Sequence, residues 1–379
     1  MNEVSFLNTP SYEDEVVFAS IEKHFINLGL NEIIKPNMKV LLKPNLLMKR
    51  KPEEATTTHP AIIRAIIKKL KLLGVSNIVL ADSPGGPYNK VAISGIYQAS
   101  GLAKVCEECD ITLNEDFGFF SQPTQDCEAV TSFTLINPIK DADFIINVAK
   151  LKTHGMTGLS GGVKNLFGTI PGLMKPELHF RFPDKNNFCN MLVDLAKTIS
   201  PDVTFVDAVV SMEGDGPSGG IPKQTGLTLA SKNPFNLDIL LCELMKIPTT
   251  TILTVSNAIR RGLCVSDFSK LNVLGDAFFK IEDFKMPNNK GIDFLEYVPK
   301  FLRKPLKPVA TKLLSSSPVI IKNKCIGCGK CAESCPAKTI DIKSKKAVIN
   351  YDNCIKCFCC HEMCPVKAIK ISRFRLFDI

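Results

Sequence analysis

Tryptophan is absent from the 379 residues, and no stretch of about 18 consecutive apolar residues occurs. The lack of a long apolar run argues against a transmembrane segment. The N-terminal sequence MNEVSFLNTPSYEDE also lacks the basic region and apolar run of a secretory signal, so we expect a cytoplasmic protein. The formal net charge is +9, but basic and aromatic residues are not interleaved. No nucleic-acid partner is therefore expected.

Two nucleotide-binding motifs are also missing. Lys164 is followed by Asn165 rather than by Ser or Thr, and the nearby glycines do not have the spacing of a Walker A loop. No strand-like segment leads into a G-x-G-x-x-G turn, so no nicotinamide or flavin fold is predicted.

Cysteine, in contrast, is abundant, with 15 residues. Disulfides are rare in the reducing cytoplasm, so we interpret the cysteines first as metal ligands. Residues 325–336 read CIGCGKCAESCP and residues 354–365 read CIKCFCCHEMCP, and both follow C-x2-C-x2-C-x3-C-P with an offset of 29 residues. This duplicated pattern is typical of two [4Fe-4S] clusters. A structural zinc site, the alternative, needs one set of four ligands and no trailing proline.

The two runs resemble a bacterial-type 2[4Fe-4S] ferredoxin, in which the fourth cysteine of each run binds the other cluster. The resemblance assigns the ligands of cluster 1 to Cys325, Cys328, Cys331 and Cys364, and those of cluster 2 to Cys354, Cys357, Cys360 and Cys335. Residues 318–379 contain 12 Lys or Arg and 5 Asp or Glu. This surplus of positive charge suits an acidic protein as redox donor or acceptor. Alternatively, the lysines only offset the negative charge of the clusters.

Residues 1–280 alternate between strand-like and helical patterns. A segment such as THPAIIRAIIKKLKLLG (58–74) is amphipathic and helical, whereas four apolar segments that end in polar residues read as strands: 38–45, 77–86, 143–154 and 202–216. The alternation predicts an α/β fold, a mostly parallel sheet with flanking helices. A connector at 281–317 and a small α+β dicluster ferredoxin-like domain at 318–379 are expected to follow.

Polar side chains gather where the four predicted strands end. Ligands of open α/β sheets bind at the carboxyl ends of the strands, so we expect one crevice assembled from four loops. The alternative is that loops are polar in any protein. The strand-end residues are Lys43, Asn45, Asp82, Ser83, Lys150, Lys152, His154, Asp207, Glu213 and Asp215.

These stretches resemble the domain of unknown function 362 family. The matching pieces are LLKPNLL (41–47), TTTHP (56–60), VLADSPGG (79–86), NVAKLKTHGMTGLSGGVKNLFG (147–168) and VDAVVSMEGDGPSGG (206–220). Domains of this family are often followed by a ferredoxin-like tail, as in this chain. The resemblance supports the fold and the crevice, but the family name assigns no reaction.

The glycine-rich loop around residues 150–172 predicts an anion site. Backbone N–H groups in Gly158–Gly162 are expected to form a nest, to which Lys150, Lys152 and Lys164 add full charges. The expected ligand is a small anionic molecule that carries a carboxylate or phosphate, and the alternative is a lysine-rich surface loop. The predicted crevice consists of Lys43, Asn45, Asp82, Ser83, Lys150, Lys152, Gly161, Gly162, Lys164 and Asn165.

Two side chains near the loop are predicted to be catalytic. His154 and Glu213 are of the types that carry protons in enzymes. The acids Asp207, Glu213 and Asp215 also suit a divalent cation, with Asp82 as a further ligand. The alternative is that these acids only pair with the lysines opposite.

Two functions are consistent with these patterns. The first is an iron–sulfur oxidoreductase that passes single electrons through two [4Fe-4S] clusters to a small anionic substrate or cofactor in the α/β domain. The second is a non-catalytic electron carrier, or a metal or cofactor assembly factor, that acts on a protein partner. We favour the first, because a carrier needs only the C-terminal part, whereas this chain keeps a large polar crevice.

Overall fold

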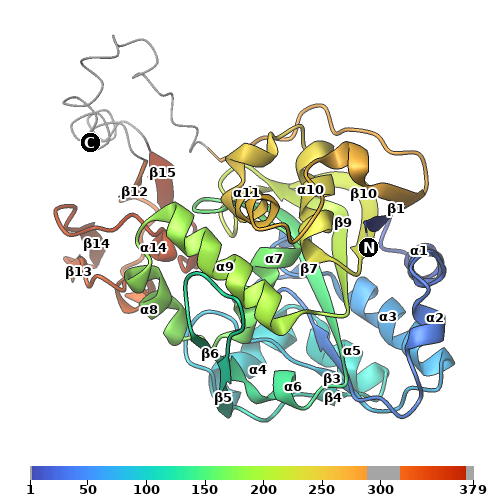
Figure 1. Ribbon diagram of the computed structural model, residues 1–379. Helices are drawn as coiled ribbons and strands as arrows, with labels where there is room; N and C mark the ends of the chain where they lie inside the picture. Colours follow the sequence, from blue (N-terminus) through green and yellow to red (C-terminus); the bar gives the residue numbers. More distant parts are fainter. Residues whose placement is uncertain (1, 288–315, 373–379) are drawn as a thin grey trace, which may run out of the picture.

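A computed structural model describes residues 2–287 and 316–372 (Figure 1). The large unit is built on a nine-stranded sheet in the order β11-β1-β10-β9-β7-β2-β3-β4, with β8 beside β7. The strands are β1 (Glu3–Asn8), β2 (Val40–Lys43), β3 (Ile78–Leu80), β4 (Thr112–Leu113), β7 (Phe144–His154), β8 (Gly158–Ser160), β9 (Val203–Glu213), β10 (Ile221–Ser231) and β11 (Asn272–Gly275). A separate hairpin pairs β5 (Phe119–Pro123) with β6 (Ser132–Ile136).

The four strands that the sequence predicts are β2, β3, β7 and β9, and all four are neighbours in the parallel part of the sheet. Strand β10 is antiparallel to both β9 and β1, and β8 is antiparallel to β7. The prediction of a mostly parallel sheet with flanking helices is confirmed. Since the four strands run in one direction, their carboxyl ends lie along the same edge of the sheet.

Helices cover both faces of the sheet. They are α1 (Asp14–Asn27), α2 (Leu30–Ile33), α3 (Pro60–Leu72), α4 (Lys90–Ala99), α5 (Leu102–Glu108), α6 (Asn137–Lys140), α7 (Gly162–Asn165), α8 (Met174–Arg181), α9 (Lys185–Ile199), α10 (Pro234–Leu244) and α11 (Leu253–Arg260). Successive residues of a strand point to opposite faces. Accordingly, Phe205 packs in the same core as α1, α3, α4 and α5, whereas Val206 packs in a core with α10 and α11.

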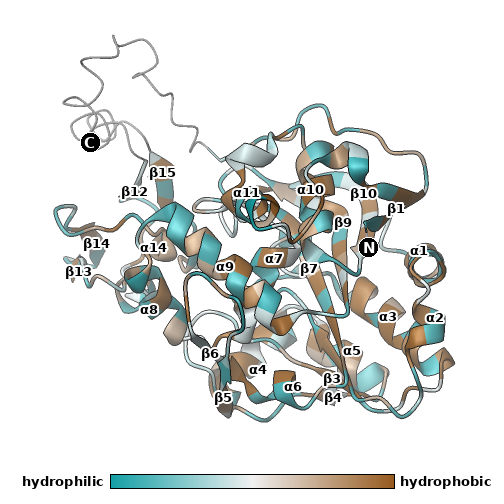
Figure 2. Cartoon of the chain, in the orientation of Figure 1, coloured by the Kyte–Doolittle hydropathy of each residue, from teal (hydrophilic) through white to brown (hydrophobic). Residues whose placement is uncertain are grey.

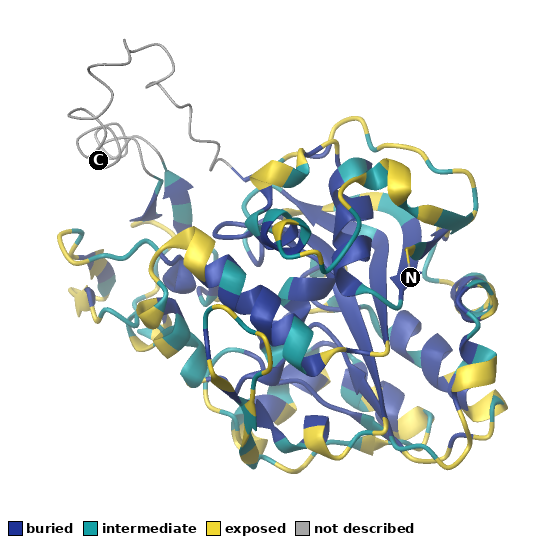
Figure 3. Ribbon diagram, in the orientation of Figure 1, coloured by how far each residue is buried: buried dark blue, intermediate teal, exposed yellow. Residues whose placement is uncertain are grey.

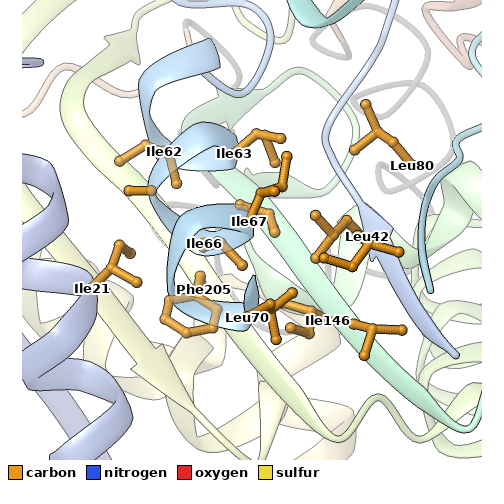
Figure 4. Packing of buried hydrophobic residues seen from close by; sticks show 14 of the residues in the cluster. Ile21, Leu42, Ile62, Ile63, Ile66, Ile67, Leu70, Leu80, Ile146 and Phe205 are labelled. Carbon is orange, nitrogen blue, oxygen red and sulfur yellow. The ribbon is translucent and has the colours of Figure 1, made fainter. Parts of the chain in front are cut away.

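Helix α3 illustrates how the first face is closed. It begins at Pro60, where the missing proline N–H costs no helical hydrogen bond. Apolar residues of α3 recur at helical spacing, and Ile67 and Leu70 lie on the side of the sheet residues Leu42 and Ile146 (Figure 4). Hydrophobic residues concentrate on the strands and on the inner sides of the helices, and the same regions are buried (Figures 2 and 3). Burying this apolar surface is the main contribution to the stability of the unit.

The C-terminal unit is small and internally duplicated. It pairs β12 (Ser317–Ile320) with β15 (Ile369–Ser372) and β13 (Ile340–Lys343) with β14 (Lys346–Ile349), both antiparallel. Its two short helices are α13 (Lys330–Glu333) and α14 (Cys359–Glu362), and they occupy equivalent positions in the two cysteine runs. The predicted α+β ferredoxin-like architecture is thus present, and Figure 1 shows it beside α8 and α9 of the large unit. We call it the ferredoxin-like unit.

The predicted connector is described only at its ends. Phe284, which the sequence assigned to the connector, is buried in the core under α10 and α11. Residues 288–315 of the connector lie outside the described residues, and the domain boundaries stay predictions. Within the described ranges, no helix combines the length and the apolar character needed to cross a bilayer.

Candidate cluster cavities and an adjoining lysine site

Two cavities in the ferredoxin-like unit are each lined by four cysteines. The first, with an empty volume of about 320 Å³, is lined by Cys325, Cys328, Cys331 and Cys364. The second, of about 300 Å³, is lined by Cys335, Cys354, Cys357 and Cys360. Each cavity takes three cysteines from one run and the fourth from the other run, as in the ligand sets that the ferredoxin resemblance implies. We call them cavity 1 and cavity 2.

The surroundings of the cavities suit [4Fe-4S] clusters. The other lining residues are mostly apolar, and backbone N–H groups point at sulfur: Ala368 N–H donates to Cys364 Sγ (3.1 Å) and Thr339 N–H to Cys335 Sγ (3.3 Å). Such hydrogen bonds stabilise thiolates and tune cluster potentials. In residues 2–287 and 316–372, no three His, Cys, Asp or Glu side chains gather as ligands of a single metal ion. A four-iron cluster takes one thiolate on each iron, so its ligands need not converge on one atom.

Two of the predicted crevice lysines form closed ion pairs inside the large unit. Lys43 Nζ lies 2.6 Å from Asp82 Oδ1, and Lys150 Nζ lies 2.8 Å from Asp207 Oδ2. All four side chains are at most 1% exposed. Tyr12 completes the second pair, because its hydroxyl donates to Asp207 Oδ1 and accepts from Lys150 Nζ. These lysines are neutralised by carboxylates, so they have little charge left for a ligand.

Lys152 lies in a different environment, without a carboxylate as its hydrogen-bond partner. Its Nζ donates to Asn45 Oδ1 (2.7 Å) and to the carbonyl of Thr56 (2.6 Å). Asn45 in turn donates to Asn165 Oδ1 (2.7 Å). Burial, with the nearby charge of Lys164, lowers the pKa of Lys152 to about 7. The structure therefore brings Asn45, Lys152 and Asn165 together in a network that fixes the position of the ammonium group.

The predicted glycine nest is filled by a carboxylate from within the protein. The N–H groups of Gly162 and Val163 donate to Asp238 of α10 at 2.7 and 3.2 Å. A Cβ atom at Gly161 would lie only 2.2 Å from Asp238 Oδ1, so glycine is needed there for close approach. The sequence did not reveal this partner, because Asp238 comes from a helix with no local link to the loop. The glycines allow the close approach of Asp238, and the N–H group of Gly162 is already satisfied.

Asp238 allows a test of this arrangement. Burial raises the pKa of Asp238 to about 7, although the two N–H donors oppose the shift. A carboxyl group whose folded pKa is raised contributes stability fully at pH values below about 4, and this contribution is lost as the pH rises towards 7. We expect Asp238→Asn to remove this loss. The free energy of unfolding of the variant, relative to that of the wild type, should therefore rise by roughly 1.4 kcal/mol per pH unit over that window. Unfolding free energies in urea at pH 4.5, 5.5 and 6.5 would measure it, and parallel curves would contradict the assignment.

Helix α14 of the ferredoxin-like unit places a carboxylate beside His154. Glu362 Oε1 lies 3.2 Å from His154 Nε2, and both side chains are largely buried. The orientation falls short of a hydrogen bond, so Glu362 Oε1 has no hydrogen-bond partner among the residues that the structure describes. Burial raises the pKa of Glu362, and the charges of Lys164 and Lys152 act against this shift. A carboxylate of the chain itself therefore lies where the sequence predicted a small anion.

The protonation state of His154 follows from its hydrogen bonds. The N–H groups of Met156 and Thr157 point at His154 Nδ1, at 3.1 and 3.4 Å, which assigns the ring proton to Nε2. Burial and the charge of Lys164 hold the pKa of His154 well below its usual value. The imidazole is thus neutral at physiological pH, and its Nε2–H lies close to Glu362 but is not aligned for a hydrogen bond to it.

Lys164 and Lys175 complete the positive side of the site. Burial lowers the pKa of both, that of Lys175 to about 7. Lys164 stacks its ammonium group over the Phe167 ring at 4.6 Å. Lys175 donates to the carbonyls of Ser83 and Pro84. The sequence analysis missed Lys175, because α8 lies outside the four strand-end loops.

Several buried polar atoms around these lysines have no hydrogen-bond partner within the described part of the chain. They include Ser83 Oγ and His179 Nδ1, and each side chain is at most 3% exposed. The ring of His179 stacks on Phe188 at 4.3 Å. Unpartnered buried polar atoms are rare and costly, so their presence near three lysines marks a place that suits a polar ligand. We call Lys152, Lys164, Lys175, His154 and Ser83 the lysine site.

Glu213 is placed in an ion pair. Its carboxylate lies 3.2 Å from Lys223 Nζ on β10 and accepts from the N–H of Lys285 (3.0 Å). Of the three acids considered for a divalent cation, Asp207 pairs with Lys150 and Glu213 with Lys223. These contacts favour the alternative interpretation, in which the acids pair with lysines.

The two units are fastened together by direct contacts. Arg50 of the large unit donates to the carbonyls of Cys364 and Pro365, both at 3.1 Å. Ser218 Oγ donates to the carbonyl of Glu362 (2.9 Å). Phe358, which lines cavity 2, is 2% exposed and packs in the core of the large unit with Phe167 and other apolar residues. Cavity 2 therefore adjoins the large unit on the side of the lysine site.

Comparison with known proteins agrees with this organisation. Residues 40–243 match the family described as "Domain of unknown function (DUF362)", and residues 317–365 match a 4Fe-4S dicluster domain. The thylakoid-associated protein sll1697 of Synechocystis sp. is 34% identical over 262 residues, which are 69% of this chain and 79% of that protein.

Among solved structures, the lactate racemase apoprotein from Thermoanaerobacterium thermosaccharolyticum is similar with a TM-score of 0.41 and 13% identity, over 66% of this chain and 58% of that one. A protein from Thermotoga maritima gives a TM-score of 0.35 and 14% identity, over 57% and 55% of the two chains. The chain thus spans less than two thirds of either solved structure. On the sequence matches, the chain belongs to the domain of unknown function 362 family and carries a 4Fe-4S dicluster domain for iron–sulfur clusters.

Proposed function

We propose that the protein is an iron–sulfur oxidoreductase that delivers single electrons to a small anionic substrate or cofactor bound at the lysine site. The observation that carries the proposal is the position of Glu362. Its carboxylate lies 3.2 Å from His154 Nε2, and the charges of Lys164 and Lys152 lower its pKa against the effect of burial. The same helix carries Cys360, a lining residue of cavity 2. A place that attracts a carboxylate thus adjoins a place suited to a cluster.

The residues of the site have complementary roles in this proposal. Lys164 and Lys152 attract the anion, and their ammonium groups lie in a buried setting where charge–charge attraction is stronger than in water. His154 Nε2–H serves as a hydrogen-bond donor to the bound anion. When bound, the two [4Fe-4S] clusters, with ligands as assigned above, would supply electrons one at a time. Glu213 is less suited to proton transfer here, because it is engaged with Lys223.

A second function is favoured by the same carboxylate. If Glu362 is a permanent occupant, the lysine site is an interface between the two units rather than a substrate site. The protein would then be an electron carrier, or a metal or cofactor assembly factor, that acts on a protein partner. No external anion would be needed, and the divalent cation and the small ligand would both be absent from the working protein.

Native mass spectrometry of protein purified without oxygen separates the two functions. We expect about eight irons per chain and a co-purified anionic molecule. Calorimetric titration with inorganic phosphate, and separately with malonate, would follow binding directly. Lys164→Gln should weaken binding by at least about tenfold, because one charge-assisted contact is lost. Lys104→Gln, a change of the same charge on an exposed side chain of α5, should leave binding unchanged. Wild-type protein that carries no anion and binds neither probe would favour the carrier.

The affinity for these probes should also depend on pH. Lys152 and Lys175, whose pKa values are lowered to about 7, lose their charge as the pH rises above 7. A site that needs both protonated lysines should therefore bind most tightly below pH 7, and weaken by up to about tenfold per pH unit above it for each lysine. Titrations with malonate between about pH 7 and 9 would show this trend, since both malonate carboxyl groups stay ionised over that range. A pH-independent affinity would mean that the anion binds elsewhere.

A further inference from the structure

The duplication offers an internal comparison between the two halves of the ferredoxin-like unit. Cys328 and Cys357 are equivalent residues, yet Cys328 is exposed and Cys357 is buried. Glu333 and Glu362 are also equivalent, yet Glu333 is exposed and pairs with Lys330, whereas Glu362 reaches His154. The first half therefore faces solvent, and the second half faces the large unit.

Sequence differences between the halves agree with these two environments. Gly329 of the first half has open space around its Cα, and its equivalent in the second half is Phe358, which packs in the large-unit core. Both residues adopt a left-handed backbone, with φ of 79° and 62°. This conformation is natural for glycine and unfavourable for phenylalanine. Phe358 is placed there despite its backbone cost, which is consistent with a docking role for the second half alone.

The solvent-facing half presents apolar side chains around an exposed cysteine. Ile326, Ile342 and Val366 line cavity 1 together with Cys328, and they are 61%, 39% and 38% exposed. An apolar patch next to a candidate ligand provides a short path from the surface to cavity 1. Exposed patches of this kind commonly mark protein interaction sites.

Lysines surround the same patch. Lys324 is exposed and precedes Cys325 in the chain, and Lys345 packs its backbone next to Gly327. Lys330, which precedes Cys331, is also exposed, and its Nζ lies 2.8 Å from Glu333 Oε2. A surface with an apolar centre and a basic rim is complementary to an acidic partner. A second copy of this chain would bring lysines against lysines, which is unfavourable.

We propose that this surface, which we call the cavity 1 face, is the docking site for an acidic one-electron carrier protein, and that cavity 2 is the internal side of the electron path. A reduced carrier would lose one electron, and a cluster held by the cysteines of cavity 1 would gain it, with no bond made or broken. The inference deepens the proposed function and rests on its ligand assignment. It does not depend on whether the lysine site binds an external anion, since the face lies on the other half of the unit.

Binding of an oxidised acidic flavodoxin to the anaerobic, cluster-loaded protein tests the proposal without turnover. Flavin fluorescence anisotropy would give the Kd at low ionic strength. We expect Lys324→Glu/Lys330→Glu to raise the Kd at least about tenfold, and added salt to raise the wild-type Kd. Ile326→Ser should raise it as well. The matched control is Lys90→Glu/Lys104→Glu, which makes the same charge change at exposed residues of the large unit.

Each outcome decides the matter. Equal weakening by the test and control pairs would show general charge attraction and overturn the proposal, as would an unchanged Kd in Lys324→Glu/Lys330→Glu. A wild-type protein that dimerises without flavodoxin, and becomes monomeric on Ile326→Ser, would assign the face to a second copy. Iron content must match the wild type in every variant, and Lys345→Glu replaces Lys330→Glu if clusters are lost. If the protein bound no anion at the lysine site but still bound flavodoxin, the proposed function would be contradicted. The proposal for the cavity 1 face would still hold.

Discussion

Replacement of Lys150 by methionine is expected to lower the free energy of unfolding by about 3–5 kcal/mol. The substitution leaves the carboxylate of Asp207 buried without its cation, and a buried unpaired charge is among the most destabilising changes known in proteins. Asp207 keeps hydrogen bonds from Tyr12 and from the His59 N–H, but these donors carry no net charge. Denaturant unfolding of the anaerobic protein at pH 7 would measure the loss.

A double variant and a matched lysine sharpen this test. Lys150→Met/Asp207→Leu removes both charges, and it should recover much of the lost stability, because apolar residues can replace a buried ion pair. Lys164 forms no ion pair with a carboxylate among the described residues. Lys164→Met should therefore change the free energy of unfolding by less than about 1 kcal/mol. If Lys150→Met instead left stability intact and abolished anion binding, Lys150 would be a ligand-binding residue, as the sequence alone predicts.

Phe358→Ala is expected to release the ferredoxin-like unit from the large unit. Truncation of a buried phenylalanine typically costs about 3–5 kcal/mol, and Phe358 is 2% exposed in a core it shares with residues of both units. Alanine keeps the unfavourable left-handed backbone, so no relief from strain offsets the loss. We expect faster hydrogen exchange in residues 162–170 and in α14. The exchange rates in the sheet should change less.

The equivalent region of the first half provides the control for Phe358. Ile326→Ala removes an exposed apolar side chain of the same unit, so it should leave hydrogen exchange at the interface unchanged. Phe358→Leu should retain most of the docking, since it preserves much of the apolar volume. Unchanged protection of α14 in Phe358→Ala would mean that the other contacts, among them those of Arg50 and Ser218, are enough to hold the units together.

The strands and their order along the chain were predictable, but the partners of the charged residues were not. β2, β3, β7 and β9 each combine an apolar run with a polar end, which is a local pattern. The pairing of Lys150 with Asp207 depends on the register between β7 and β9, in which the two residues lie opposite each other. Register is a property of the folded sheet and cannot be read from the strand-end residues alone. The sequence therefore does not separate lysines that are neutralised by a carboxylate from lysines that can still bind an anion.

Local sequence patterns also could not predict that the C-terminal unit contributes Glu362 to the site. Glu362 belongs to a cysteine run whose spacing is explained by cluster ligation alone, and its equivalent, Glu333, is an ordinary exposed residue. One signal was available in the sequence. The second run has Phe358 where the first has Gly329, a change that makes physical sense only if the second half is covered. The cysteine sets, in contrast, follow a fixed spacing, and they line two cavities as the resemblance implies.

The contacts between α14 and the large unit are made within one chain, and this fixes the kinetic order of the proposed path. Arrival of an electron from a carrier is bimolecular, so its rate falls on dilution. Transfer from the ferredoxin-like unit to the lysine site is unimolecular, because Arg50, Ser218 and Phe358 already hold the two units in register. At saturating carrier, turnover per chain should therefore be independent of protein concentration. In a system with a separate ferredoxin, turnover would depend on concentration, because the ferredoxin must meet its enzyme for each electron.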